Sequence, residues 1–123
     1  MNDNLSKNKN FLEPEIVNEF IELLEKKNTK KLKKRIQNFH SSEIAAYLQI
    51  LNDLNRRRLL KILKKNFDSQ ILVELETNFL EKIINEIEFS ILSKAIGELN
   101  SDDAVSIIES LDEKKRKKLL SKI

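Results

Sequence analysis

Two adjacent carboxylates, Asp102 and Asp103, are the side chains of this sequence best suited to ion chemistry. Oxygen ligands suit Mg²⁺, which keeps several of its waters and takes only one or two carboxylates from a protein. Asn100 and Ser101 precede the pair, so the segment also has the pattern of a helix start, where a capping residue is followed by acids. The residues alone therefore allow two interpretations, a weak Mg²⁺ site or a structural helix N-terminus.

Other catalytic or metal-binding chemistry has little basis in the sequence. The chain has no Cys and one His, which excludes thiolate nucleophiles and the usual zinc ligand sets. It has a single Gly and therefore no Gly-rich phosphate loop. The lone His40 stands three residues before Glu43, a spacing that favours a helix cap or a packed side chain over a ligand. We therefore predict that the protein is not an enzyme.

The charges favour a solvated surface over a nucleic-acid interface. There are 23 Lys and Arg against 20 Asp and Glu, for a net charge of +3. Residues 26–35, 56–65 and 114–118 are locally basic, as a phosphate-binding surface would be. No aromatic residue lies among these basic residues as a stacking platform, so we interpret them as the exposed faces of amphipathic helices. We expect no nucleic-acid partner.

Apolar residues recur every twelve positions and determine the expected fold. Three series share this spacing: Phe39, Leu51, Leu63, Leu75, Ile87, Leu99, Leu111, Ile123; Ile36, Leu48, Leu60, Leu72, Ile84, Ile96, Ile108, Leu120; and Tyr47, Leu59, Ile71, Ile83, Ala95, Ile107, Leu119. Twelve residues make about three and a third helical turns, so one unbroken helix would rotate this apolar stripe by roughly 120° per repeat. The chain must therefore break in each repeat, which predicts short helices that bury one another's apolar faces.

The expected fold class is all-α, a superhelical stack of about nine or ten short helices preceded by one longer helix. The long helix is expected from Pro14 to about Lys27, followed by a short helix over residues 30–38. Helices of the repeat are expected to start at the capping patterns of His40 and Asn100, and near Asn52, Asn66, Asn78 and Ser90. Gly97 lies inside a helical stretch, where we expect it to allow a close helix contact.

The two ends of the sequence differ in character. Residues 1–10 are polar and aperiodic, and we expect a disordered tail there. The last repeat stops at the apolar Ile123 with no capping residue after it, so we expect residues 11–123 to be a domain cut from a longer protein. No apolar run has the length of a membrane span and no signal peptide is present, which indicates a cytoplasmic segment that does not enter the membrane.

The repeats resemble the N-terminal cytosolic domain of MgtE magnesium transporters. Residues 20–51, FIELLEKKNTKKLKKRIQNFHSSEIAAYLQIL, look like the family's opening with its His and following acid. Residues 96–111, IGELNSDDAVSIIESL, look like the family's repeated E-L-x-x-D-D-x-x-x-x-L element. The resemblance covers about residues 15–123 and implies a right-angled superhelical stack of short helices.

The resemblance also implies a function and a set of partners. In that family a pair of CBS domains, a connecting helix and a dimeric five-helix membrane pore follow this domain. Mg²⁺ bound between acids of the N domain and the CBS domains favours pore closure. By position, Asp102 matches one of the family's acids, with Asp103 as a helper, whereas Ser106 and Gln70 stand where two further acids are expected. We therefore expect weak or partner-dependent Mg²⁺ binding, with the CBS and membrane domains as partners and dimerisation through the missing parts.

A helical-repeat interaction scaffold without ion sensing is the second interpretation. Helical-repeat domains of the flagellar motor switch protein are built similarly. The basic segments and the two missing acids favour this scaffold, whereas the elements at His40 to Glu43 and at Asp102 to Asp103 favour the transporter domain.

Overall fold

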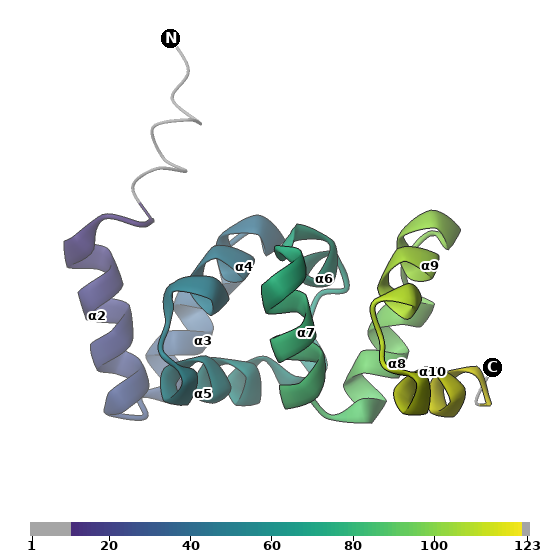
Figure 1. Cartoon of the computed structure of the whole chain (residues 1–123). Coiled ribbons are helices and arrows are strands. Elements are labelled where there is room, and N and C mark those ends of the chain that lie inside the picture. The colour runs from purple at the N-terminus through teal and green to yellow at the C-terminus, as the bar shows by residue number, and fades with distance from the viewer. Residues whose placement is uncertain (1–10, 122–123) are drawn as a thin grey trace, which may run out of the picture. The chain divides into compact units, whose positions relative to one another are not determined.

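The protein is helical throughout the part of the chain that is described. The computed structural model describes residues 11–121, apart from the side chain of Lys65 (Figure 1). Within this range no strand forms, and the elements are α2 (Pro14–Glu25), α3 (Thr29–Gln37), α4 (Ser41–Ile50), α5 (Asp53–Leu63), the 3₁₀ helix η1 (Lys64–Asn66), α6 (Gln70–Glu74), α7 (Thr77–Glu86), α8 (Phe89–Gly97), α9 (Ser101–Glu109) and α10 (Glu113–Leu120). The all-α prediction is confirmed. The predicted disordered tail, residues 1–10, lies outside the described residues, and so does Ile123, the last residue of the twelve-residue apolar series.

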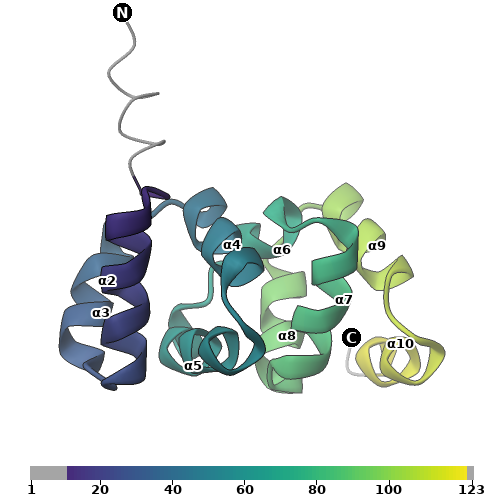
Figure 2. The ribbon, with the colours of Figure 1, turned by 60° about the vertical axis from the view of Figure 1, so that its left-hand side comes forward.

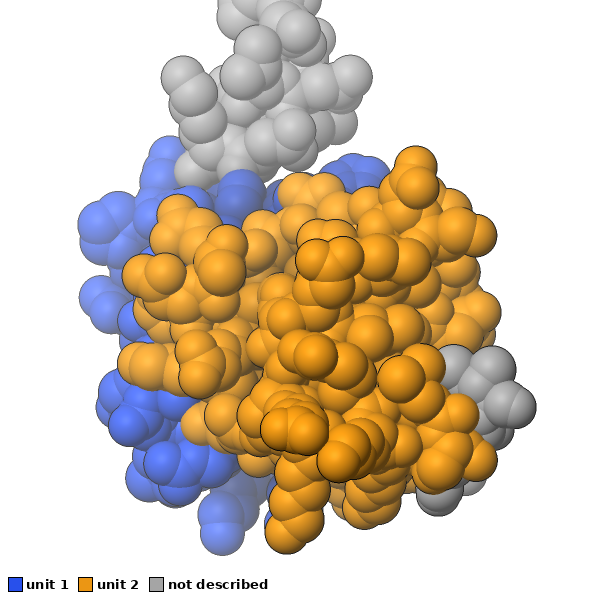
Figure 3. Space-filling view, turned by 45° about the vertical axis from the view of Figure 1, so that its right-hand side comes forward, with its two compact units in different colours: residues 1–62 blue, residues 63–123 orange. Residues whose placement is uncertain are grey.

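The chain forms two compact units, residues 1–62 and residues 63–123, which Figure 3 colours separately. The twelve-residue repeat sets where helices begin in both units. Six helices keep the spacing, with first residues Ser41, Asp53, Thr77, Phe89, Ser101 and Glu113. Five of these starts had been predicted, all but the one at Glu113, and they agree with the expected positions to within one residue. The repeat therefore specifies helix boundaries as well as burial.

One step of the repeat is missing, and the helix start predicted near Asn66 is wrong. The chain there forms η1, which contains Asn66, and α6 begins only at Gln70. In other repeats an apolar residue commonly stands three positions before the series that begins at Tyr47. Here that position, three residues before Ile71, holds Asp68. The neighbouring Phe67 is buried instead. The Asp68 carboxylate accepts a hydrogen bond from the Gln70 N–H at 2.9 Å. Asp68 thus forms a turn that delays the helix.

Arginines occupy the same position of the repeat at two other steps. Arg56 is 3% exposed and pairs with Asp53 at 2.7 Å. Arg116 donates from its guanidinium to the carbonyl of Leu111 at 2.9 Å, just after the end of α9. Arg116 is half-buried, whereas Arg56 is buried and needs its partner, because an unpaired charge in the core would be very costly.

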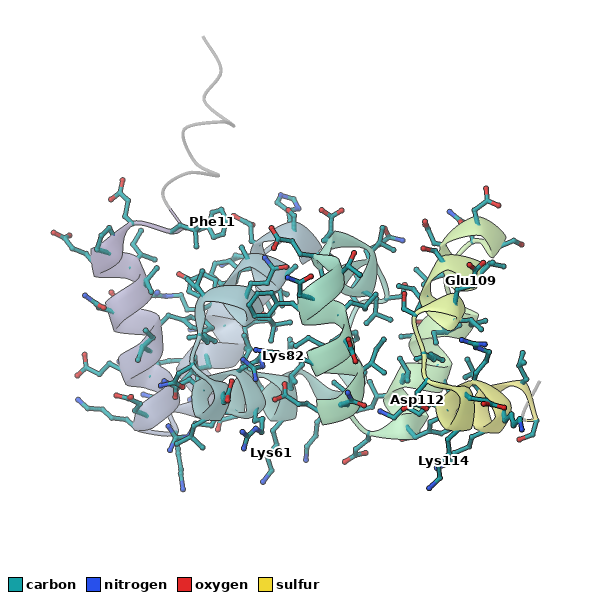
Figure 4. The ribbon with its side chains drawn as sticks, in the orientation of Figure 1. Phe11, Lys61, Lys82, Glu109, Asp112 and Lys114 are labelled. Atoms are coloured by element: carbon teal, nitrogen blue, oxygen red, sulfur yellow. The ribbon has the colours of Figure 1, made fainter. Side chains whose placement is uncertain are left out.

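The core of residues 11–62 contains a cluster of aromatic rings. The α2 helix is the longest one in the described range, as predicted, and it buries Phe20. The ring of Tyr47, on α4, is fully buried and lies 4.5 Å from Phe20 and 5.4 Å from Phe39, centroid to centroid. Its hydroxyl donates to the main-chain carbonyl of Phe11 at 2.6 Å, which ties the segment before α2 to α4. Phe11 is labelled in Figure 4.

The core of residues 63–121 is mostly aliphatic. The α9 helix packs against both α6 and α8. Ile71 and Ile83 are completely buried, and Leu92 and Leu119 nearly so. Most residues of the twelve-residue series in this unit are buried, as predicted, but Leu120 is 52% exposed. α10 is attached to α7 by Lys115, whose ammonium donates to the carbonyl of Ile84 at 3.1 Å.

Gly97 does not make the close helix contact that we expected. A Cβ atom added at this residue would meet no atom within 4 Å, and its backbone φ is not positive. Gly97 is the last residue of α8 and is exposed. No steric or conformational need for glycine therefore exists at this position.

Candidate functional site

The acidic turn at the start of α9 is built by its capping residue. The side-chain oxygen of Asn100 accepts the N–H of Asp103 at 2.9 Å, and its carbonyl accepts the N–H of Ala104 at 2.9 Å. Ile107 on the same helix is buried. Asp102 is exposed and Asp103 is half-buried. The helix-start interpretation of this segment is thus confirmed in its geometry, and Asp102 is left facing solvent.

The two carboxylates are poorly placed to hold one ion together. Adjacent residues of an α-helix point about 100° apart and do not face each other. Within residues 11–121 no group of three or more His, Cys, Asp or Glu side chains is placed to hold a metal ion. What the turn offers is one exposed carboxylate, which suits Mg²⁺ only if water or a partner supplies the other ligands.

The positions at which the resemblance implied further acids lie on two helices in contact. Gln70 is the first residue of α6, Ser106 is in α9, and these helices pack together. Both side chains are exposed. The helix pair therefore presents two uncharged side chains at these positions. Gln70 is on α6, and Ser106 is on α9, the helix that also carries Asp102.

His40 and Glu43 act as a structural pair. The N–H of His40 donates to the Glu43 carboxylate at 2.8 Å, and the N–H of Glu43 donates to the His40 carbonyl at 3.0 Å. Glu43 is only 8% exposed, whereas His40 is exposed. The capping interpretation made from the spacing is confirmed, and it accounts for the burial of the carboxylate.

Two lysines of the basic segment, residues 114–118, make contacts with other helices within residues 63–121. The Lys115 ammonium donates to Asn85 as well as to the Ile84 carbonyl, and Lys118 lies 4.4 Å from the ring centre of Phe89. Lys114 extends away from α10 (Figure 4). Two of these lysines thus stabilise the attachment of α10, which leaves fewer free charges on this surface than the sequence suggested.

A groove between α2 and α3 concentrates positive charge. The two helices lie side by side (Figure 2) and line an open groove of about 750 Å³. Four cations and two carboxylates line the groove, namely Lys26, Lys31, Lys34, Arg35, Glu19 and Glu22. Sequence reasoning marked residues 26–35 as basic but missed the groove, because the acids of the other helix and the concave shape depend on how α2 and α3 pack.

Two ion pairs neutralise part of this groove. Lys26 contacts Glu22 at 2.6 Å, and Arg35 contacts Glu19. The hydrogen bond and the charge of Lys26 lower the pKa of Glu22, and those of Glu22 raise the pKa of Lys26. The remaining formal charge is +2 and lies on Lys31 and Lys34, both exposed.

None of the helices in residues 11–121 combines the length and the apolar character that a membrane span needs. A family model described as the MgtE intracellular N domain matches residues 39–123, more than two thirds of the chain. No curated protein and no solved structure matches the chain. The matched range contains α4 to α10, including the acidic turn, and leaves α2 and α3 outside.

Proposed function

The chain belongs to the family of the MgtE intracellular N domain, a regulatory domain of magnesium transporters, and on this premise we propose that it senses Mg²⁺ through Asp102. In this proposal Mg²⁺ is held between Asp102 and acids of CBS domains in the same full-length protein. The domain then docks when Mg²⁺ is abundant, and docking favours pore closure.

The observation that supports this proposal is the exposure of Asp102 within the matched range. A carboxylate in the first turn of a capped helix has a defined position and remains accessible to another domain. Asp103 is half-buried, and its N–H is held by Asn100. We assign Asp103 a helping role, in which it adds negative charge near the ion without being its main ligand.

Electrostatics make the proposed sensing dependent on the partner. The positive end of the α9 helix dipole stabilises a carboxylate at this turn and opposes a second positive charge beside it. The chain also carries a net charge of +3. We therefore expect the domain alone to bind Mg²⁺ weakly, and the acidic partner to supply most of the negative charge. Mg²⁺ can shift the equilibrium between docked and undocked domains only by the difference between its affinities for the two states.

The other parts of the proposal concern the whole transporter. The domain would lie on the cytosolic face of the membrane, next to the CBS and membrane domains, and dimerisation would arise through those parts. Lysines of the domain can also pair directly with acids of the CBS domains. Docking by that route would respond to ionic strength more than to Mg²⁺.

The test is a Mg²⁺ titration of the chain followed by backbone amide NMR. Ca²⁺ and NaCl at matched ionic strength serve as ion controls. The variant Asp102→Asn removes the proposed ligand, and Glu113→Gln is its matched control, because Glu113 is an exposed acid in the first turn of another helix. The same titrations are repeated with the CBS domains of the full-length protein added.

We expect Mg²⁺ at millimolar concentration to shift the amides around Asp102 and to promote docking on the CBS domains. Asp102→Asn should lose both effects, and Glu113→Gln should retain them. If docking is independent of Mg²⁺ or unaffected by Asp102→Asn, the sensing proposal is wrong. Docking that follows ionic strength alone would favour the interaction scaffold.

A further inference from the structure

We propose that the groove between α2 and α3 binds an acidic peptide segment of a partner protein through Lys31 and Lys34. These residues lie outside the range matched by the family model, so the inference does not depend on Mg²⁺ sensing.

The charge of the groove selects an acidic occupant. Arg35 and Lys26 are already paired with the two carboxylates of α2, whereas no ion pair involving Lys31 or Lys34 is found among the described residues. α3 has five basic residues and no acid over nine residues, so the charge on this helix is not balanced locally. Carboxylates brought to Lys31 and Lys34 would balance it.

The uncharged lining favours a peptide over other polyanions. Gln37 and Asn38 contribute side-chain amides, which can both donate to and accept from peptide groups, and Leu23 contributes the apolar contact. No aromatic ring lines the groove on which a nucleotide base could stack.

The size of the groove is also suitable. Its volume of about 750 Å³ lies within the range of roughly 300–1,000 Å³ found for ligand sites. A concave surface of this kind fits an inserted segment better than a flat lipid headgroup layer.

The test uses a fluorescein-labelled oligoglutamate peptide containing one leucine, with binding measured by fluorescence anisotropy in the presence of EDTA. The variant Lys31→Gln/Lys34→Gln removes the two unpaired charges. Lys30→Gln/Lys33→Gln is the matched control, because it removes the same charge from exposed positions of the same helix that do not line the groove. Circular dichroism establishes that both variants are folded.

We expect the groove variant to bind the peptide roughly five- to twenty-fold more weakly than the unmodified chain, and the control to change less than two-fold. Amide NMR shifts should be concentrated at Lys31, Lys34, Gln37 and Asn38. The proposal is overturned if the chain does not bind the peptide, if the two variants lose affinity equally, or if a single-stranded oligonucleotide or phosphatidylserine vesicles bind to the groove more tightly than the peptide.

Discussion

Replacing Tyr47 by Phe isolates a single hydrogen bond in an otherwise unchanged core. The ring is fully buried against Phe20 and Phe39, and its hydroxyl donates to the Phe11 carbonyl at 2.6 Å. The substitution keeps the ring and removes the donor. A hydrogen bond of this kind contributes about 0.5–1.5 kcal/mol net. Because Phe11 is only half-buried, water can reach its carbonyl, and we expect a loss of about 1 kcal/mol at pH 7.

The same substitution should change how stability depends on pH. Burial raises the pKa of Tyr47 above its usual value of 10.0, with a smaller upward effect from Glu43 and an opposing effect from Arg35. The raised pKa means that the folded state favours the protonated phenol. Its contribution is therefore complete below pH 10 and is lost as the pH rises through the folded pKa. The loss is at most about 1.4 kcal/mol per pH unit.

The stability difference between the two proteins should therefore shrink above pH 10. The unmodified protein loses stability there as its unfolded state loses the Tyr47 proton more readily than its folded state, and the Phe variant has no such group. Lys and Arg titrate in both proteins, so their effects cancel in the difference. The two proteins should therefore differ by about 1 kcal/mol at pH 7 and by less at pH 11.

Two measurements check this reasoning. Urea unfolding followed by far-ultraviolet circular dichroism gives the stability difference at each pH. Tyr47 is the only tyrosine of the chain, so the ultraviolet absorbance of tyrosinate reports its pKa directly. If the phenol of the folded protein titrates at 10, or if the stability difference is the same at pH 7 and pH 11, the assigned burial and hydrogen bond are wrong.

Three further substitutions have expected effects on unfolding free energy, measured by urea unfolding at neutral pH. Gly97→Ala should stabilise the protein by about 0.5–1 kcal/mol, because a Cβ meets nothing within 4 Å. Destabilisation would mean that Gly97 does make a close helix contact. Asn100→Ala should cost about 1 kcal/mol through loss of the α9 cap, and no change would mean that its 2.9 Å hydrogen bond is not formed. Ile83→Ala should cost about 2–5 kcal/mol, since the side chain is completely buried, whereas Val105→Ala, at a residue 52% exposed, should change stability by less than about 0.5 kcal/mol; similar losses would contradict the burial pattern.

Much of the candidate site was predictable because its signals are local. Asn100 followed by Asp102 and Asp103 is a helix start by composition, and the hydrogen bond to Asp103 forms within that same turn. The cap formed by His40 and Glu43 spans three residues and is local for the same reason. That Asp102 faces solvent was not predictable in this way, because exposure depends on which side of α9 packs against α6 and α8.

Neither the groove nor the burial of Arg56 was predicted. Arg56 occupies a position that is apolar in several other repeats, and its spacing from Asp53 allows an ion pair within α5 but does not reveal that the arginine is buried. The groove needs α3 to lie beside α2, so that Lys31 and Lys34 line the same surface as the acids of α2. The groove is therefore a property of two helices in contact.

The sequence by itself determined that the chain is helical and where most helices begin, because a twelve-residue apolar repeat cannot remain on one face of a single helix. Tertiary structure decided the exceptions. Phe67 is buried and Asp68 forms a turn, so one helix of the repeat is replaced by a 3₁₀ turn and the short α6. The physical reason is that periodicity records which side chains are apolar, whereas burial, pairing and grooves arise only when particular helix faces meet.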